Sequence, residues 1–352
     1  MGHYHSFSTT RSLITGANKI WAEGEDWMAL GLGSNLVVSD GGFPGHVLHV
    51  QTRGVTVKKA TGRKVLIHAE AGEDWDSFVA HTLAQGVRGL ETLSGIPGTV
   101  GASVVQNIGA YGAEISDSLV SIDFLHYPTG ERETISASDL ALGLRTSSLK
   151  TGALQGVVLG VTFALEPATE GLSIPILYQQ LADSLGVAIG DRASLEKVRE
   201  TVRSIRASKG MLLSDDDPDS WSSGSFFLNP VVTEKVSHSL PPQTPRWLVG
   251  ETQQDLVVPL GSSQPPGSAT LSEPGLVKVS AAWLIEHSGI HKGFSLPGSR
   301  AAVSNKHSLA ITNRGDATAA DVAELARYIV TTVGNKTGIY LVPEPTLVGI
   351  DL

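Results

Sequence analysis

The sequence predicts an α+β fold divided into more than one domain, and three observations support this. Segments rich in β-branched residues and segments with helical periodicity alternate along the whole chain. No long block consists of one kind alone, which is typical of a mixed fold. With 352 residues, 41% hydrophobic and 17% charged, the chain can bury a core large enough for two or three domains.

Three segments are expected to form strands. They are rich in branched apolar residues and are bounded by glycine or acidic turns, and they cover residues 28–38, 64–70 and 156–165.

Three segments carry apolar residues at helical spacing and are expected to form amphipathic helices. The clearest begins at Thr318, whose hydroxyl can cap it together with Asp321, and it ends at Gly334. Prolines concentrated between Leu240 and Pro274 predict irregular surface loops instead. The other two helices place on one face Trp75, Phe78, Val79 and Leu83, and Leu195, Val198, Val202 and Ile205.

The composition argues against several classes of protein. A net charge of −9 is unsuited to a protein that binds nucleic acid, because such a protein presents a basic face. No apolar stretch approaches the roughly 20 residues that span a bilayer, so we expect a cytoplasmic protein without membrane attachment. The chain has no cysteine, which excludes disulfides, thiolate metal sites and cysteine nucleophiles. Any redox chemistry must therefore come from a cofactor.

Two segments contain residue types that can bind a metal, an acidic run and a pair of histidines, but neither is expected to do so. The run from Asp215 to Asp219 lacks the spaced ligands and the glycine of a calcium loop, and a solvated loop explains it better. His287 and His291 are four residues apart, but Gly289 weakens the helix that such a zinc pair needs.

The most informative segment runs from Ser94 to Gly112. Gly95, Gly98 and Gly101 are each three residues apart, so backbone N–H groups can approach a ligand that a Cβ atom would push away. A diphosphate suits such a loop, and a glycine-rich turn between strands is the alternative. The spacing matches neither the GxGxxG fingerprint nor a Walker loop. A second glycine loop at residues 31–35 precedes an apolar strand, and two such loops indicate one long cofactor.

Three further segments place a polar residue in rigid surroundings. Ser225 follows Gly224 and precedes two phenylalanines that would anchor the chain, although a packed strand with an incidental serine also explains this pattern. Glu344 stands between two prolines in an apolar run, so it either faces water at an edge or is buried with a partner. Arg145 is a candidate for that partner, or for a clamp that grips a substrate carboxylate with two N–H groups.

These motifs, in this order, resemble the UDP-N-acetylenolpyruvoylglucosamine reductase family, the flavoenzymes of peptidoglycan precursor synthesis. The resemblance covers nearly the whole chain, residues 31–349. It rests on the segment 94–112 and on the runs GSFFLNP at 224–230, AAWLIE at 281–286, KHSL at 306–309, TNRG at 312–315 and PEP at 343–345.

The resemblance implies a fold of two FAD-binding subdomains of the vanillyl-alcohol-oxidase (PCMH) type and a C-terminal α+β substrate domain. Residues 1–57 and 336–352 would form the first subdomain, 58–205 the second, and 206–335 the substrate domain. The implied activity is an NADPH-dependent oxidoreductase that acts on a C=C bond. FAD would accept a hydride from NADPH and pass it to the enolpyruvyl group of UDP-N-acetylglucosamine enolpyruvate. We expect the protein to act as a monomer on this small-molecule substrate.

The resemblance also assigns catalytic and cofactor-binding residues. Arg145 would meet the substrate carboxylate, Glu344 would help to polarise it, and Ser225 would donate a proton to the adjacent carbon. FAD would be held by Gly33, Ser34, Asn35, Ser94, Gly95, Ile96, Pro97, Gly98, Gly101, Ala102, Gln106, Asn107, Gly109, Ala110, Tyr111 and Gly112.

The UDP part of the substrate would contact three other residues. Lys209 and Asn229 match family positions at the nucleotide diphosphate, and Tyr178 resembles a tyrosine that folds over it. Tyr178 lies in an amphipathic segment, so a position at the edge of a core is an equally weighted alternative.

The N-terminal segment departs from the family pattern. Only nineteen residues separate Arg11 from Gly31, where the family usually has a longer segment with a helix and a strand. The first subdomain is therefore expected to lack a helix, so the adenine end of FAD would be covered in another way.

Two other functions are compatible with part of this pattern. An FAD oxidoreductase of the same fold, acting on another carboxylate, would keep the 94–112 segment but would not need the nucleotide-binding residues. A flavin-binding or sugar-nucleotide-binding protein without activity would need no catalytic residues, and the intact set of three argues against it.

Overall fold

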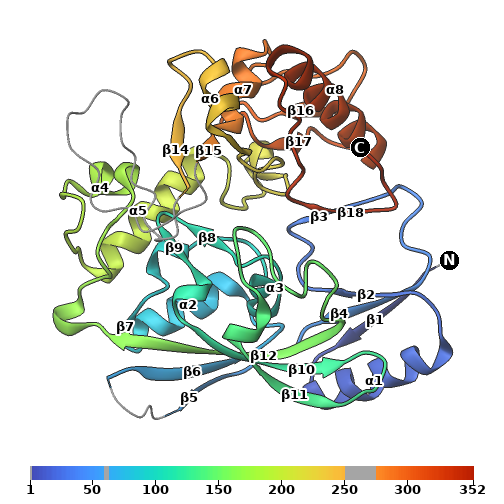
Figure 1. The fold of residues 1–352 in the computed structure, drawn as a ribbon. Helices are drawn as coiled ribbons and strands as arrows, with labels where there is room; N and C mark the ends of the chain where they lie inside the picture. Colours follow the sequence, from blue (N-terminus) through green and yellow to red (C-terminus); the bar gives the residue numbers. More distant parts are fainter. Residues whose placement is uncertain (1, 59–62, 250–274) are drawn as a thin grey trace. The chain divides into compact units, whose positions relative to one another are not determined.

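The computed structural model describes residues 2–58, 63–249 and 275–352, and its chain forms two compact units (Figure 1). Unit 1 consists of Met1–Ser34 and Gly41–Ser208, and unit 2 consists of Asn35–Asp40 and Lys209–Leu352. Each unit mixes strands and helices, which confirms the α+β class. The division into three domains expected from the sequence stays a prediction.

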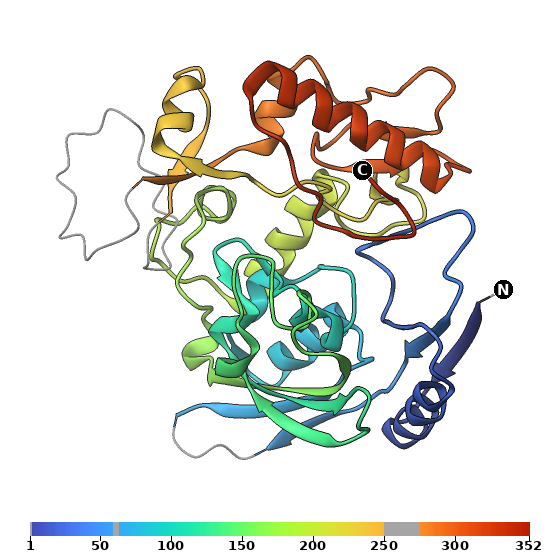
Figure 2. The same cartoon turned by 45° about the vertical axis from the view of Figure 1, so that its right-hand side comes forward.

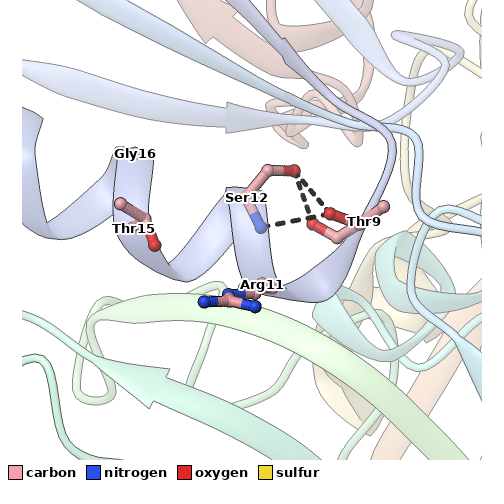
Figure 3. Close-up of a pocket in the computed structure, with 5 residues that line it drawn as sticks. All are labelled: Thr9, Arg11, Ser12, Thr15 and Gly16. Atoms are coloured by element: carbon pink, nitrogen blue, oxygen red, sulfur yellow. Dashed lines mark hydrogen bonds between the residues drawn. The ribbon is translucent and has the colours of Figure 1, made fainter.

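Unit 1 begins with a small parallel sheet covered by a helix. Its strand order is β1 (His3–Phe7), β4 (His46–Val50), β2 (Trp27–Leu30), and the helix α1 (Thr10–Glu23) contacts β1 and β4. Thr9 caps α1, because its hydroxyl accepts the Ser12 N–H at 3.2 Å. Thr9 and Ser12 also line a pocket at this end of the helix, with Arg11, Thr15 and Gly16 (Figure 3).

The expectation that no helix precedes Gly31 is therefore wrong. The short segment accommodates a helix because α1 starts directly after β1. The helix ends at Gly24, whose left-handed conformation turns the chain toward β2. A sequence signal for α1 exists in four apolar residues at helical spacing, all buried: Leu13, Ala17, Ile20 and Trp21.

The larger sheet of unit 1 is antiparallel, with the order β11-β10-β12-β6-β5, and β7 also pairs with β12. Its core holds Trp75, Phe78 and Phe163, each at most 1% exposed. The predicted strands at 64–70 and 156–165 are confirmed, and so are the two helices predicted from the apolar faces that begin at Trp75 and at Leu195. The elements of this part are β5 (Val55–Lys58), β6 (Val65–Glu70), α2 (Trp75–Ala84), β7 (Val87–Arg88), α3 (Val100–Val105), β8 (Gly109–Ala110), β9 (Ala113–Glu114), β10 (Leu119–His126), β11 (Arg132–Ser136), β12 (Gly156–Pro167), α4 (Gln179–Leu185) and α5 (Leu195–Ser208).

The described residues of unit 2 form three small sheets and three α-helices. The first sheet is the parallel pair β3 (Leu36–Val38) and β18 (Thr346–Val348), which joins the start and the end of this unit. The strand expected at 28–38 is thus two strands, β2 and β3, interrupted by the glycine loop 31–35. The remaining elements are β13 (Val231–Thr233), α6 (Glu234–Ser239), β14 (Arg246–Leu248), β15 (Leu276–Val279), α7 (Ala281–His287), β16 (Ala301–Val303), β17 (Ile311–Asn313) and α8 (Ala319–Thr337).

Helix α8 is the long helix over β16 and β17 (Figure 2). Thr318 caps it as predicted, in a reciprocal capping box with Asp321. The predicted end at Gly334 is wrong, because the helix continues to Thr337 and stops at Gly338 in the left-handed region. Gly334 instead makes room inside the helix, since a Cβ there would lie 2.5 Å from the Tyr340 ring.

In the described ranges, no helix is long and apolar enough to cross a bilayer. Of the loops predicted between Leu240 and Pro274, residues 250–274 lie outside the described residues, and β14 forms within the rest.

Candidate functional site

The two glycine loops predicted from the sequence lie against each other in unit 1. The Ser34 hydroxyl donates to the Pro97 carbonyl at 2.9 Å. A Cβ on Gly31 would lie 2.8 Å from the Thr99 hydroxyl, and a Cβ on Gly98 would lie 3.3 Å from the Ser34 hydroxyl. The glycines therefore permit a close approach of the two loops, as one long ligand that contacts both would require.

Backbone donors remain available where these loops meet. In the part of unit 1 that the structure describes, no acceptor is bonded to the N–H groups of Ile96 and Gly98. Gly98 is a buried residue with a φ of 141°, a conformation that favours glycine. Buried N–H groups are nearly always paired in folded proteins, so an unpaired one indicates a ligand oxygen. This observation fits the diphosphate of FAD.

Gly101 serves a different purpose from the one the sequence indicated. Its N–H donates to the Ala71 carbonyl at 2.8 Å, so this donor is already used within the protein. A Cβ on Gly101 would lie 2.7 Å from the Cβ of Ala71. The glycine therefore lets α3 pack against the end of β6 and fixes the loop from behind.

Gly95 is held on both sides of its backbone. Its N–H donates to Asp76 Oδ1 at 2.6 Å, and its carbonyl accepts the Arg206 Nε–H at 2.9 Å. Asp76 also forms a bidentate pair with Arg199, at 2.7 and 2.9 Å, and a further bond with Arg203. Burial raises the pKa of Asp76, but the hydrogen bonds from Arg199 and Gly95 outweigh it and hold this pKa below its usual range. Sequence reasoning missed Asp76 and the three arginines of α5.

The other predicted FAD residues surround this loop or follow it. Ser94 is buried and donates its hydroxyl to the Glu91 carbonyl at 2.7 Å. Ala102 lies in α3, Gln106 is its C-cap residue, and Gly109 and Ala110 form β8. All of them belong to unit 1 except Asn35, which is the first residue of unit 2.

Arg145 has a constrained backbone and a partly buried side chain. Its φ is 54°, in the left-handed region that non-glycine residues rarely occupy, and its guanidinium donates to the Gly109 carbonyl at 2.6 Å. The nearby Glu114 accepts an N–H from Asn107 at 2.7 Å. Burial raises the pKa of Glu114, although Asn107 and the positive charge of Arg145 oppose the rise. Arg145 is thus oriented by fixed groups, as a carboxylate clamp requires.

Tyr178 is 42% exposed at the start of α4, so it is not buried, and the predicted alternative of a core-edge position stays open. Its ring meets that of Tyr111 edge to face, with 5.5 Å between the centroids. Burial raises the pKa of Tyr111, whose own φ is 51°. The role of Tyr178 at a substrate stays a prediction.

In unit 2, Ser225 and Glu344 lie on neighbouring extended segments. The Phe226 N–H donates to the Leu309 carbonyl at 2.8 Å, and the Phe226 carbonyl accepts the Glu344 N–H at 2.9 Å. Phe226 and Phe227 are each 1% exposed, so the expected anchoring of this segment is confirmed. The backbone of Phe226 thereby links the segment that carries Ser225 to the segment that carries Glu344.

A residue that sequence reasoning left without a role faces Ser225. His307 Nε2 lies 3.5 Å from the Ser225 hydroxyl oxygen. Burial lowers the pKa of His307 to about 4, and the positive charges of Lys209 and Lys292 act in the same direction. Lys209, predicted at the substrate diphosphate, is thus near enough to His307 for its charge to act on this pKa.

Asn229 already has one structural contact. Its side-chain oxygen accepts the Ala281 N–H at 2.9 Å, in the first turn of α7. The amide nitrogen is the end of this side chain that a substrate oxygen would contact.

The acidic run at 215–219 is not simply a solvated loop. Asp219 is 5% exposed and accepts bonds from Ser304 at 3.0 Å, the Asn305 N–H at 2.8 Å and Arg314 at 2.7 Å. Burial raises the pKa of Asp219, but these hydrogen bonds outweigh it and lower this pKa overall. Its partners are far away in sequence, which is why the run alone did not reveal this role. No group of three His, Asp or Glu side chains in the described chain is arranged to hold a metal.

The predicted site residues fall into two groups, one in each unit. Arg145 and the paired glycine loops belong to unit 1, and Ser225, Glu344, Lys209 and Asn229 belong to unit 2. A single site that contains all of them stays a prediction.

Comparisons with known proteins identify relatives of the whole chain. A family model described as an FAD binding domain matches residues 8–136, and one for the C-terminal domain of UDP-N-acetylenolpyruvoylglucosamine reductase matches 216–348. The reductase of Leifsonia xyli is 48% identical over 97% of this chain and 92% of its own, and that of Saccharopolyspora erythraea is 47% identical over 93% and 85%. The crystal structure of the Thermus caldophilus enzyme has the same fold, with a TM-score of 0.59 at 23% identity, over 98% of this chain and 91% of that one.

Proposed function

Because the chain belongs to the UDP-N-acetylenolpyruvoylglucosamine reductase family, we propose that it reduces UDP-N-acetylglucosamine enolpyruvate to UDP-N-acetylmuramate in peptidoglycan precursor synthesis. FAD, when bound, supplies the hydride that it has received from NADPH. The observation that carries the proposal is the pairing of the Ser225 and Glu344 segments through the backbone of Phe226.

The glycine loops hold the cofactor in this proposal. The unpaired N–H groups of Ile96 and Gly98 donate to diphosphate oxygens, and Ser34 and Gly33 border the same place from the other loop. Gly95 keeps the loop in position through its two bonds to Asp76 and Arg206.

Three residues bind the enolpyruvyl group and promote its reduction in this proposal. Arg145 grips the carboxylate and stabilises the negative charge that develops on it, since a guanidinium forms two parallel bonds to a carboxylate. Glu344 helps to polarise this carboxylate. Ser225 donates its hydroxyl proton to the adjacent carbon, which is a strong base once the double bond has received a hydride. Exclusion of water keeps that proton transfer directed.

Lys209, Asn229 and Tyr178 bind the nucleotide part. The ammonium of Lys209 and the amide nitrogen of Asn229 suit the oxygens of a diphosphate, and the exposed ring of Tyr178 is available to cover it. UDP-sugars and NADPH are anions that do not cross a bilayer, so we place the reaction in the cytoplasm.

The visible spectrum of the purified protein tests this function. A yellow protein that NADPH bleaches without oxygen, and that the UDP-enolpyruvyl sugar then restores to yellow, agrees with the proposal. UDP-N-acetylglucosamine without the enolpyruvyl group is the matched control and leaves the protein bleached. Bleaching without recovery would instead indicate a flavin enzyme for another carboxylate substrate. A colourless protein that still binds UDP-sugars would indicate a binding protein without activity.

A further inference from the structure

His307 and Ser225 both belong to unit 2, and the imidazole of His307 contacts the hydroxyl of Ser225. The Nε2 atom lies 3.5 Å from the Ser225 oxygen, a distance that is long for a hydrogen bond. Catalytic hydrogen bonds are often long before the substrate binds and shorten in the complex. The contact is therefore a candidate for a bond that matters during the reaction.

The backbone around His307 is fixed by a buried carboxylate. The Ser304 hydroxyl accepts the N–H groups of Lys306 and His307, at 3.0 and 3.2 Å, and donates to Asp219 at 3.0 Å. Asp219 also binds the Asn305 N–H. The imidazole thus extends from a turn that has little freedom to move.

Burial, together with nearby positive charges, keeps His307 neutral at physiological pH. Burial lowers its pKa to about 4, and the positive charges of Lys209 and Lys292 add to this effect. A neutral imidazole has one N–H donor and one lone pair, so its tautomer decides what it offers to Ser225.

The chemistry of Ser225 requires one of the two tautomers. If Nε2 carried the lone pair, the Ser225 O–H would point at the imidazole and away from the substrate. If Nε2 carries the proton, it donates to the serine oxygen, and the O–H hydrogen is directed elsewhere. Only the second arrangement leaves a serine proton for the substrate carbon.

We propose that His307 is a positioning residue whose Nε2–H donates to the Ser225 oxygen, so that the serine O–H is aimed at the substrate carbon. This inference rests on the proposed function. During the transfer the serine O–H bond breaks and a C–H bond forms, while the electron pair of the broken bond stays on the serine oxygen. The Nε2–H bond stabilises that oxygen, and His307 keeps its own proton. A water molecule returns a proton to Ser225 before the next turnover.

The test uses His307→Leu, His307→Gln and, as a matched control, His291→Gln, which replaces an exposed histidine of the same unit. Stopped-flow absorbance follows bleaching by NADPH and then recovery of the yellow colour with the UDP-enolpyruvyl sugar. We expect His307→Leu to slow recovery about 100-fold, as the loss of one oriented donor does, with bleaching unchanged. His307→Gln should restore most of the rate because its amide N–H can donate, and His291→Gln should match the unaltered protein. KM for the sugar should stay within about twofold, since the bond acts after binding.

A spectroscopic measurement gives a readout independent of turnover. Nitrogen-15 NMR of the unaltered protein should show His307 neutral and protonated at Nε2 between about pH 5.5 and 8. Protonation at Nδ1 alone, or a His307→Leu protein that recovers at the normal rate, would overturn the inference. Melting temperature and flavin content of each variant exclude misfolding as the cause of slow recovery. If the unaltered protein bleaches but never recovers with the sugar, the proposed function fails, and the NMR result still decides the bond to Ser225.

Discussion

Arg206 and Gly95 are joined by a hydrogen bond from the guanidinium Nε–H to the glycine carbonyl, 2.9 Å long, although 111 positions separate them. The same glycine donates its N–H to Asp76, which Arg199 and Arg203 hold in place. Helix α5 therefore fixes the conformation of the loop whose next N–H groups are unpaired. A cofactor that binds there meets a loop that is already ordered, which reduces the entropy lost on binding.

Replacement of Asp76 by alanine should loosen this loop. The Gly95 N–H loses its acceptor, and two partly buried arginines lose their carboxylate. We expect an FAD affinity about tenfold lower, or about 1.4 kcal/mol, measured by quenching of flavin fluorescence. Asp74→Ala, which removes the cap of the same helix, is a control for helix stability, because Asp74 accepts the Ser77 N–H and does not contact Gly95. An Asp76→Ala protein with normal affinity would mean that α5 does not order the loop.

Asp76 should also make the free energy of unfolding depend on acidic pH. The pKa of its carboxyl is lower in the folded protein than in the unfolded chain, so the unfolded state binds more protons between the two values. Its contribution is complete above the unfolded pKa of about 4 and is lost as the pH falls through the folded pKa. Urea unfolding of apoprotein from pH 6 to pH 3 should give a shallower decline for Asp76→Asn than for the unaltered chain. Equal slopes for the two would contradict this.

Removal of the Ser225 hydroxyl should separate the two half-reactions. In Ser225→Ala, NADPH should still bleach the flavin at the normal rate, because the proton donor takes no part in that step. Recovery with the UDP-enolpyruvyl sugar should slow by about 10³-fold, within the range for loss of a positioned acid. Ser223→Ala, two residues earlier in the same segment, is the matched control. Loss of bleaching in Ser225→Ala would place the serine at the cofactor and not at the substrate.

A methyl group on Gly101 should destabilise unit 1. The new Cβ would lie 2.7 Å from the Cβ of Ala71 and 3.0 Å from its carbonyl oxygen, in a buried place where backbone cannot easily move. We expect Gly101→Ala to lower the free energy of unfolding by about 1–3 kcal/mol, measured with urea. Restored stability in the double variant with Ala71→Gly would show that this contact is the cause. An unchanged single variant would show that α3 shifts without cost.

Much of the fold could be predicted because its signals are local. The capping box at Thr318 and Asp321 lies within four residues, and the strand at 156–165 has a continuous apolar pattern. Gly334 misled the prediction of the helix end because one glycine inside a helix and one after it look alike in sequence. Only the Tyr340 ring packed against Gly334 distinguishes them.

The site was predictable in its residue types but not in its supports. Glycine runs and isolated polar residues stand out in the sequence, and the structure pairs the glycine loops as expected. Asp76 resembles an ordinary acidic residue in the first turn of a helix, and its partners lie in α5. Asp219 and His307 likewise gain their roles from residues 85 and 82 positions away. Such pairings depend on the tertiary fold, which a single sequence does not reveal.

The segment around Phe226 is bonded through its backbone to a neighbour on each side, and this has a consequence for how the gene can change. Side chains along an extended, paired segment alternate between two faces. The number of residues in the segment therefore decides which side chain lies on which face. Many substitutions nearby would leave the arrangement intact. Loss of the single codon for Ser225 would put the phenyl ring of Phe226 where the hydroxyl belongs.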